Sequence, residues 1–173
     1  KSGFLAWAQA QEGRFELVGR RVVMMVGGSK AHALVASRLT RALWACLDLD
    51  RWVVLGSDLA VDVGPESLRY ADAIVDVVGG GNELTATAPA LIAEVLSPSS
   101  ATLDLGDKAA EYLRLASLQA YLVLAQDEPK AWVWVRGPHG FAAGPDVMNG
   151  PDAVLRVPAL GITVKLADIY GQG

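Results

Sequence analysis

The chain has 173 residues, of which 52% are hydrophobic, and a formal net charge of −4 at pH 7. This length fits a single domain, which we expect to span residues 1–173, and the single cysteine, Cys46, excludes an internal disulfide and a cysteine-based zinc cluster. The negative charge argues against a protein that coats nucleic acid, and no apolar run approaches the roughly 18 residues of a membrane span.

The first part of the chain predicts a helix, a hairpin and a second helix. The N-terminal residues lack the features of a signal peptide, so we expect a cytoplasmic protein, and residues 3–10 have the apolar spacing of a short helix. Residues 14–26, "RFELVGRRVVMMV", form two apolar runs around a Gly-Arg-Arg turn and predict a β-hairpin. Ser29 is a suitable N-cap for the next helix, in which apolar residues recur at helical spacing from residue 35 to 46.

From Trp52 onward, the apolar pattern mostly has the period of two that is typical of strands. The stretch "ALIAEVL" is apolar without alternation, as expected for a strand that is covered on both faces, and a helical pattern follows over residues 103–117. Strands are predicted over residues 52–56, 59–63, 69–78, 90–96, 120–125 and 131–137, with one or two more strands and a helical turn in residues 153–170. This order predicts an α/β sandwich with a mixed central sheet flanked by helices and with an N-terminal hairpin.

Glu94 lies in the middle of the uninterrupted apolar strand, where a charged group is least favourable. A buried carboxylate is costly unless it is paired, hydrogen-bonded or bound to a metal ion. Asp72 lies near the start of the preceding strand, so the two carboxylates meet at one end of the sheet if the two strands are neighbours. Adjacent carboxylates repel each other, and a hard divalent cation with oxygen ligands relieves that repulsion.

Lys108 follows Glu94 by fourteen residues, in what we interpret as the first turn of a helix, where the helix dipole disfavours a cation. A lysine in this place can point back to the end of the strand that carries Glu94. Two acids, a lysine and a metal ion together form a set that can cleave phosphodiesters. Spacing alone leaves two other interpretations open. Glu94 could be an ordinary buried acid that is satisfied by a basic side chain, and Lys108 could pair along its own helix with Asp104 or Glu111.

Four motifs occur in order along the chain: "FELV", "SKAH", "YADAIVDVV" and "AEVLSPSSATLDLGDKAAEYL". In these motifs the sequence resembles the PD-(D/E)XK nuclease superfamily and, within it, a bacterial family of restriction-endonuclease-like proteins known as a domain of unknown function. The resemblance covers nearly the whole chain, and its specific part is "EVLSPS" followed at this distance by Asp and Lys. It implies a restriction-endonuclease-like sandwich and metal-dependent hydrolysis of DNA, with Mg²⁺ as the cofactor and Mn²⁺ as a substitute.

The same resemblance implies roles for four side chains and one carbonyl group. Asp72 matches the acid of the Pro-Asp motif, and Glu94 matches the acid of the (D/E)XK strand. The family uses a lysine of the following helix, here Lys108, and places a further acid near the site, here Glu16. The superfamily also implies a metal contact from the carbonyl of Val95. We therefore expect catalytic roles for the four side chains and metal contacts from Asp72, Glu94 and Val95.

The sequence departs from the pattern at several positions. Leu96 stands where the common superfamily pattern has its lysine, and Ala71 stands where the Pro-Asp motif has its proline. The turn after Glu16 reads "VGRR" instead of the family's common "VDGE", which puts a second acid there in doubt. His32 matches a family position, and we interpret it as structural.

These observations predict a Mg²⁺-dependent endodeoxyribonuclease in which Asp72 and Glu94 hold the metal, Lys108 positions the attacking water and Glu16 tunes the site or binds a second ion. Two alternatives stay open at this point: a catalytically silent nuclease-fold module for DNA or protein interaction, and a metal-dependent hydrolase of small phosphate esters. The apolar content, a shared face of two tryptophans in residues 131–137, and the resemblance predict a homodimer.

Overall fold

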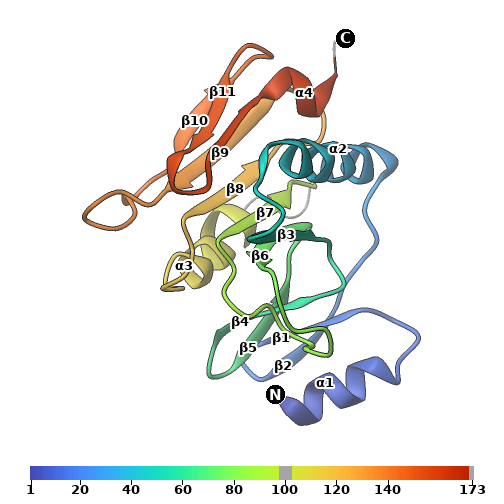
Figure 1. Ribbon diagram of the computed structural model, residues 1–173. Coiled ribbons are helices and arrows are strands. Elements are labelled where there is room, and N and C mark those ends of the chain that lie inside the picture. Colours follow the sequence, from blue (N-terminus) through green and yellow to red (C-terminus); the bar gives the residue numbers. More distant parts are fainter. Residues whose placement is uncertain (98–102, 172–173) are drawn as a thin grey trace.

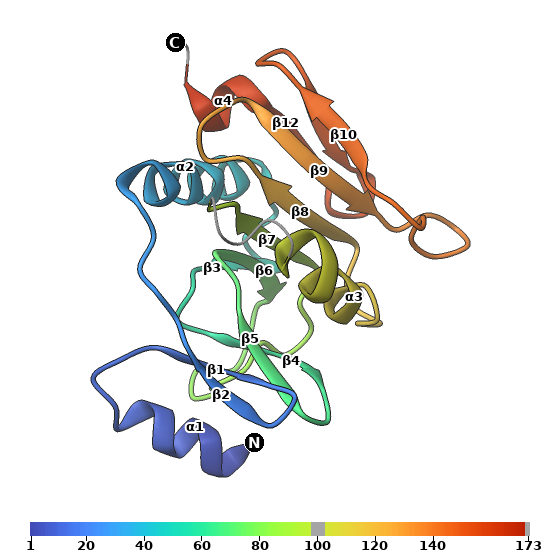
Figure 2. The ribbon, with the colours of Figure 1, turned by 180° about the vertical axis from the view of Figure 1, so that it is seen from behind.

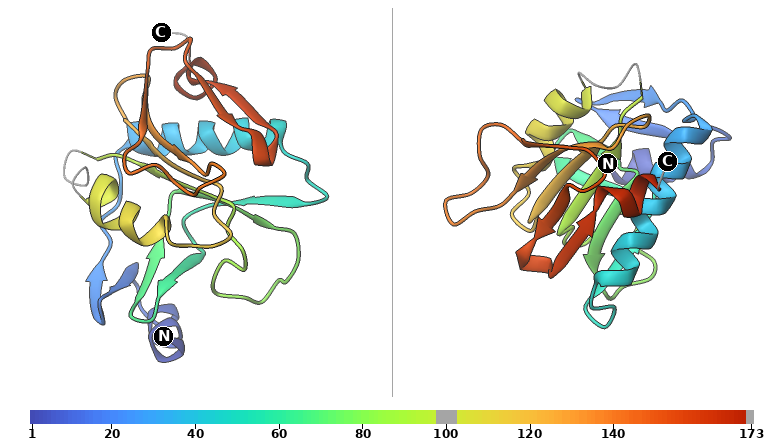
Figure 3. Two further views of the ribbon diagram at one scale, coloured as in Figure 1. Left: turned by 90° about the vertical axis from the view of Figure 1, so that its left-hand side faces the viewer. Right: turned by 90° about the horizontal axis from the view of Figure 1, so that it is seen from above.

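The computed structural model describes residues 1–97 and 103–171, and its largest sheet separates two layers (Figure 1). One face of the six-stranded sheet packs on helix α2 (Lys30–Cys46), on helix α4 (Leu166–Tyr170) and on a two-stranded ribbon. The opposite face packs on helix α3 (Ala109–Tyr112) and on residues of the four-stranded sheet. Figure 3 shows α2 and α3 on opposite sides of the sheet. The predicted α/β sandwich is therefore confirmed.

The six-stranded sheet is mixed. Its strand order is β10-β9-β8-β7-β6-β3, and β7 and β8 are parallel whereas the other neighbours are antiparallel. The parallel pair requires a crossover, which the helical segment between the two strands supplies. In chain order, these strands are β3 (Trp52–Leu55), β6 (Ala73–Val77), β7 (Leu91–Val95), β8 (Ala120–Leu124), β9 (Lys130–Val135) and β10 (Asp146–Asn149).

The predicted N-terminal hairpin is present and belongs to the four-stranded sheet. Strands β1 (Phe15–Val18) and β2 (Arg21–Met24) pair antiparallel, and Gly19 and Arg20 between them have φ angles of 53° and 67°. Positive φ at both central residues is characteristic of the tight turn that matches the twist of paired strands. The sheet order is β2-β1-β5-β4, with β4 at Ala60–Gly64 and β5 at Ser67–Tyr70. Helix α1 (Ser2–Gln9) precedes the hairpin.

Helix α2 begins where the sequence predicts it. The Ser29 hydroxyl accepts a hydrogen bond from the His32 amide at 3.1 Å, which satisfies one of the free N–H groups of the first turn. The helix buries Val35, Leu39, Ala42 and Leu43 against the sheet. As a result, the N-terminal end of α2 carries His32 to the strand ends where Asp72 lies.

The predicted strand over residues 69–78 is wrong as a single element. The chain leaves the four-stranded sheet at Tyr70 and enters the six-stranded sheet at Ala73, so β5 and β6 belong to different layers (Figure 2). Ala71 is fully buried at this crossing and Asp72 follows it. The apolar pattern of the sequence does not reveal the crossing, because both strands are buried in the core.

The helix that carries Lys108 differs from the predicted one in two ways. It starts within the described residues as a π-helical segment, η1 (Leu103–Lys108), and continues as α3 only as far as Tyr112. Lys108 is thus the last residue of η1, not a first-turn residue, so the helix dipole does not explain its unusual position. Residues 98 and 99 of the quoted "EVLSPS" motif lie outside the described part of the chain.

The C-terminal part completes the sheet and covers one of its faces. Strand β10 was absent from the predicted set, and the ribbon consists of β11 (Val154–Val157) and β12 (Ile162–Lys165) around a 3₁₀ turn (Pro158–Leu160). Trp134 stacks on Tyr121 with ring centroids 5.5 Å apart and is only 5% exposed, so it belongs to the core. The tryptophan face therefore gives no support to the predicted homodimer. No helix in residues 1–97 and 103–171 is long and apolar enough to cross a membrane.

Candidate active site

Three separate elements bring the predicted side chains to one end of the six-stranded sheet. Strands β6 and β7 are antiparallel with Ala73 opposite Ala93, which places Asp72 beside Glu94. Along β7, alternate residues face opposite layers, and Glu94 faces the same layer as α3, which Lys108 directly precedes. Asp72, Glu94 and Lys108 therefore lie together because of the strand register and the position of the helix.

Glu94 and Lys108 form a buried ion pair. The Lys108 Nζ lies 2.9 Å from Glu94 Oε1, and the two side chains are 9% and 5% exposed. The Tyr112 hydroxyl donates a second hydrogen bond to the same Glu94 oxygen at 2.9 Å. Burial raises the pKa of Glu94 to about 8; Lys108 opposes this rise, and the nearby charges of Asp72 and Asp104 add to it. Burial lowers the pKa of Lys108, but the acids around it outweigh that effect and raise the pKa above its ordinary value.

Asp72 accepts hydrogen bonds from two directions at one oxygen. The Val95 amide donates to Asp72 Oδ2 at 2.7 Å, and His32 Nε2 lies 3.2 Å from the same atom. The hydrogen bond to Asp72 raises the pKa of His32, burial opposes this, and the Glu94 charge and the Val95 backbone contribute in the same direction as Asp72. His32 therefore orients Asp72, which is more specific than the general structural role expected for it.

Glu16 lies in the same region but has its own internal partners. Its Oε1 accepts a hydrogen bond from the Tyr70 amide at 3.0 Å, and its Oε2 lies 3.1 Å from Arg69 Nη1. Arg69 is 2% exposed and also reaches Glu111 Oε2 with its Nε at 2.6 Å. The guanidinium thus joins β1 and β5 to the helix that carries Lys108. Both Glu16 oxygens are engaged, an arrangement that suits tuning of the site better than binding of a second ion.

Asp104 is a further buried acid of this cluster. Its side chain is 3% exposed, and its Oδ1 lies 3.3 Å from Lys108 Nζ, four residues along η1. The geometry of this contact does not make a hydrogen bond, and Oδ1 has no hydrogen-bond partner within the described part of the chain. The Tyr121 hydroxyl bonds to the Asp104 backbone carbonyl at 2.8 Å and so fixes this turn of η1. Lys108 therefore lies between two buried carboxylates.

The cluster has more acids than cations. Five carboxyl groups, those of Glu16, Asp72, Glu94, Asp104 and Glu111, face two permanently cationic side chains, Arg69 and Lys108, together with His32. This excess of buried acid, with the Val95 carbonyl beside it, is a set of hard oxygen donors of the kind that Mg²⁺ prefers.

The donor set fits a divalent cation that keeps part of its water shell. Over residues 1–97 and 103–171, no group of three or more His, Cys, Asp and Glu side chains is arranged to enclose a metal. Mg²⁺ is commonly bound by one or two carboxylates together with water and substrate phosphate. Asp72, Glu94 and the Val95 carbonyl can supply such a partial shell.

Sequence reasoning found some members of the site and missed others. It singled out Asp72, Glu94 and Lys108, which the structure brings to one place. It treated the Asp104–Lys108 spacing only as an ordinary helical pair, and it gave Arg69 and Tyr112 no role. The spacing of four residues between Asp104 and Lys108 was a usable signal, whereas the partners of Arg69 lie 53 and 42 residues away in the chain.

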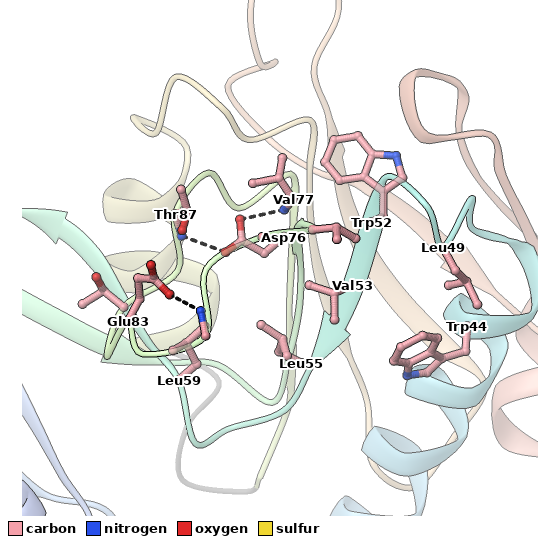
Figure 4. Close-up of a pocket in the computed structure, with 14 residues that line it drawn as sticks. Trp44, Leu49, Trp52, Val53, Leu55, Leu59, Asp76, Val77, Glu83 and Thr87 are labelled. Atoms are coloured by element: carbon pink, nitrogen blue, oxygen red, sulfur yellow. Dashed lines mark hydrogen bonds between the residues drawn. The ribbon is translucent and has the colours of Figure 1, made fainter.

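A separate cavity lies at the edge of the six-stranded sheet next to β3. It has a volume of about 360 Å³ and is lined by Trp44, Leu49 and Trp52 among others (Figure 4). Its buried acid, Asp76, already accepts hydrogen bonds from the amides of Val77, Thr87 and Ala88. None of the carboxylates of the cluster lines this cavity, so the two features are distinct.

Comparisons with known proteins place the chain in a family. The model of the Uma2 family, described as "Putative restriction endonuclease", matches residues 2–167. "Uncharacterized protein slr1290" of Synechocystis is 30% identical over 125 residues, which are 70% of this chain and 66% of that protein. "Uncharacterized protein sll1609" of the same organism is 29% identical over 123 residues, 68% of this chain and 69% of that protein. The matched part is thus about two thirds of each relative's length.

A solved structure supports the fold. The crystal structure of "a putative nuclease belonging to DUF820" from Anabaena variabilis matches with a TM-score of 0.74 and 16% identity, over 92% of this chain and 91% of that chain. The predicted restriction-endonuclease-like fold is thereby confirmed. With a family model that matches nearly its whole length, the chain belongs to the Uma2 family of putative restriction endonucleases.

Proposed function

We propose that the protein is an endonuclease that hydrolyses phosphodiester bonds in DNA with Mg²⁺ as its cofactor and Mn²⁺ as a substitute. The observation that carries this proposal is the contact between Lys108 and Glu94 at the strand ends where Asp72 lies. A structural ion pair would need only one acid, whereas this cluster gathers an excess of carboxylates around one lysine. Family membership supports the same chemistry.

In this proposal Asp72 and Glu94 hold the metal ion, and the Val95 carbonyl completes the protein's share of its ligands. When bound, the ion supplies Lewis-acid polarisation of the phosphate and lowers the pKa of water. His32 and the Val95 amide keep Asp72 in one orientation. Tyr112 does the same for Glu94 through its hydroxyl group.

Lys108 has the chemistry to act on the reacting groups. An ammonium has three N–H donors, and two of its neighbours here are Glu94 and Asp104. The third donor can reach a water molecule or a non-bridging phosphate oxygen. Because this ammonium is buried among acids, it stays charged over the working pH range and can offset negative charge that develops on the phosphate.

The test is a cleavage assay on supercoiled plasmid and on single-stranded DNA, each with Mg²⁺, with Mn²⁺ or with a chelator. We expect cleavage only with a metal ion, and a loss of about 100-fold or more in Lys108→Met. The matched control is Lys130→Met, because Lys130 pairs with Glu128 at 3.6 Å in a solvent-exposed contact outside the cluster's ion pairs.

Two results would contradict the proposal. Folded protein that binds DNA but cleaves neither substrate with either ion would identify a silent nuclease-fold module. Equal cleavage by the parent and by Lys108→Met would show that this cluster is not where the reaction occurs.

A further inference from the structure

We infer that Asp104 is a positioning residue: it holds the Lys108 ammonium when Glu94 is engaged by a metal ion. The inference rests on the proposed function and adds to it a residue to which neither the sequence nor the family resemblance gave a role in the reaction. The geometry that points to it is a lysine between two buried acids: Glu94 also accepts a hydrogen bond from Tyr112, whereas Asp104 Oδ1 has no hydrogen-bond partner among the described residues.

The first observation is the unsatisfied oxygen. Asp104 is 2% exposed, yet its Oδ1 has no hydrogen-bond partner among the described residues. A buried acceptor left without a hydrogen bond costs free energy, so such atoms are rare in native proteins and call for an explanation. The Lys108 ammonium is 3.3 Å away, near enough for attraction but outside the range of a good charge-assisted hydrogen bond.

The second observation is that Glu94 Oε1 is already occupied. It contacts Lys108 and also accepts from Tyr112, so a cation that uses this oxygen meets the like charge of the ammonium. A buried ammonium that loses the partner it contacts most closely is strongly unfavourable. Lys108 therefore needs a second acceptor within a small rotation of its side chain, and Asp104 Oδ1 is in that place.

The backbone of η1 allows the Lys108 ammonium to move from Glu94 to Asp104. Asp104 and Lys108 belong to the same π-helical segment, and the Tyr121 hydroxyl fixes the carbonyl of Asp104. Single π turns in helices often occur at functional sites. A fixed Asp104 backbone and a flexible lysine side chain allow the ammonium to change partners while the helix stays in place.

The test is a double-mutant cycle without metal or DNA, so it does not depend on cleavage. Glu94→Gln imitates the loss of the Glu94 charge to a metal ion, and Asp104→Asn removes the second acceptor. Each single variant leaves Lys108 one carboxylate, and we expect a small change in melting temperature. The double variant leaves a buried ammonium with none, and its loss should exceed the sum of the single losses by roughly 5–15 °C.

A crystal structure of Glu94→Gln gives a direct readout. We expect the Lys108 Nζ to Asp104 Oδ1 distance to shorten from 3.3 Å to about 2.7–2.9 Å. Additive losses in the cycle, or a Glu94→Gln variant that is already as unstable as the double variant, would overturn the inference. A Lys108 ammonium that keeps its original position beside β7 in that crystal structure would overturn it as well.

Mn²⁺ affinity, measured by calorimetry, separates this role from direct metal binding. We expect Asp104→Asn to weaken Mn²⁺ binding about tenfold or more, and we expect this effect to disappear in a Lys108→Met background, where no ammonium has to move. Weakening of equal size in both backgrounds would make Asp104 a metal ligand and overturn the inference. A parent protein that binds no Mn²⁺ contradicts the proposed function, while the metal-free cycle still decides on Asp104.

Discussion

Replacement of Arg69 by Met is the sharpest test of how the site is held together. Arg69 is 2% exposed, with Glu16 at 3.1 Å and Glu111 at 2.6 Å. Met is unbranched and fits an apolar environment, so the substitution removes the charge, the N–H donors and the volume of the guanidinium end while keeping the apolar stem. Glu16, which is 7% exposed, would keep only the hydrogen bond from the Tyr70 amide.

The size of the effect follows from this burial. Loss of one partner of a buried ion pair leaves an uncompensated charge and costs roughly 3–5 kcal/mol. For a protein of this length, that corresponds to a decrease in melting temperature of about 6–20 °C. The assay is thermal and urea unfolding of the metal-free protein, analysed with a two-state fit.

Arg20→Met is the matched control. Arg20 also pairs with a glutamate, Glu66, at 2.6 Å, but its side chain is 80% exposed. Exposed ion pairs contribute about 0–1 kcal/mol, so this variant should melt within about 4 °C of the parent. Equal losses in Arg69→Met and Arg20→Met would refute the reasoning. A triple variant with Glu16→Gln and Glu111→Gln should recover most of the loss of Arg69→Met, because neither acid that Arg69 contacts then remains charged without a cation.

Three further outcomes are expected. From about pH 5 to pH 8 the metal-free protein should lose stability, because burial raises the pKa of Glu94 from 4.5 to about 8 and the folded state keeps a proton that the unfolded chain has released. Urea unfolding at pH 5 and at pH 8 should show this loss. Glu94→Gln should remove most of the difference between the two pH values. Mg²⁺ should raise the melting temperature of the parent and leave that of Asp72→Asn nearly unchanged, whereas equal shifts in both would place the ion elsewhere. Sedimentation at micromolar concentration should show the predicted homodimer, and a monomer at all concentrations would contradict it.

Elements whose own residues indicate their structure, through turn residues, helix caps or apolar spacing, could be predicted from the sequence. The hairpin follows from two apolar runs around a turn that needs positive φ, and α2 follows from its Ser29 N-cap and helical spacing. Strand β7 was recognisable because an uninterrupted apolar run indicates a strand covered on both faces. In that context Glu94 stood out as a carboxylate with no apparent partner, and it is the centre of the observed cluster.

Features that depend on distant partners could not be predicted. The crossing between β5 and β6 at Ala71 has no local signal, because both strands are buried on either side of it. A π-helical turn and an α-helical turn also have similar apolar spacing, so the sequence did not reveal η1. Arg69 reads as a polar residue of a strand, and its burial becomes visible only when β1 and α3 are in place.

The charges of the cluster link its stability to its chemistry. A site that served only to hold the fold together would give each of its acids a hydrogen bond from a cation, as Arg69 does for Glu16 and Glu111. Around Lys108 the hydrogen bonding is incomplete, since Asp104 Oδ1 has no hydrogen-bond partner among the described residues while Glu94 and Asp72 lie nearby. Burial, helped by the charges of Asp72 and Asp104, raises the pKa of Glu94, because protonation is how a buried acid lowers its energy. A divalent cation would do the same without a proton, which is why we propose that a metal ion binds at the half of the cluster around Lys108.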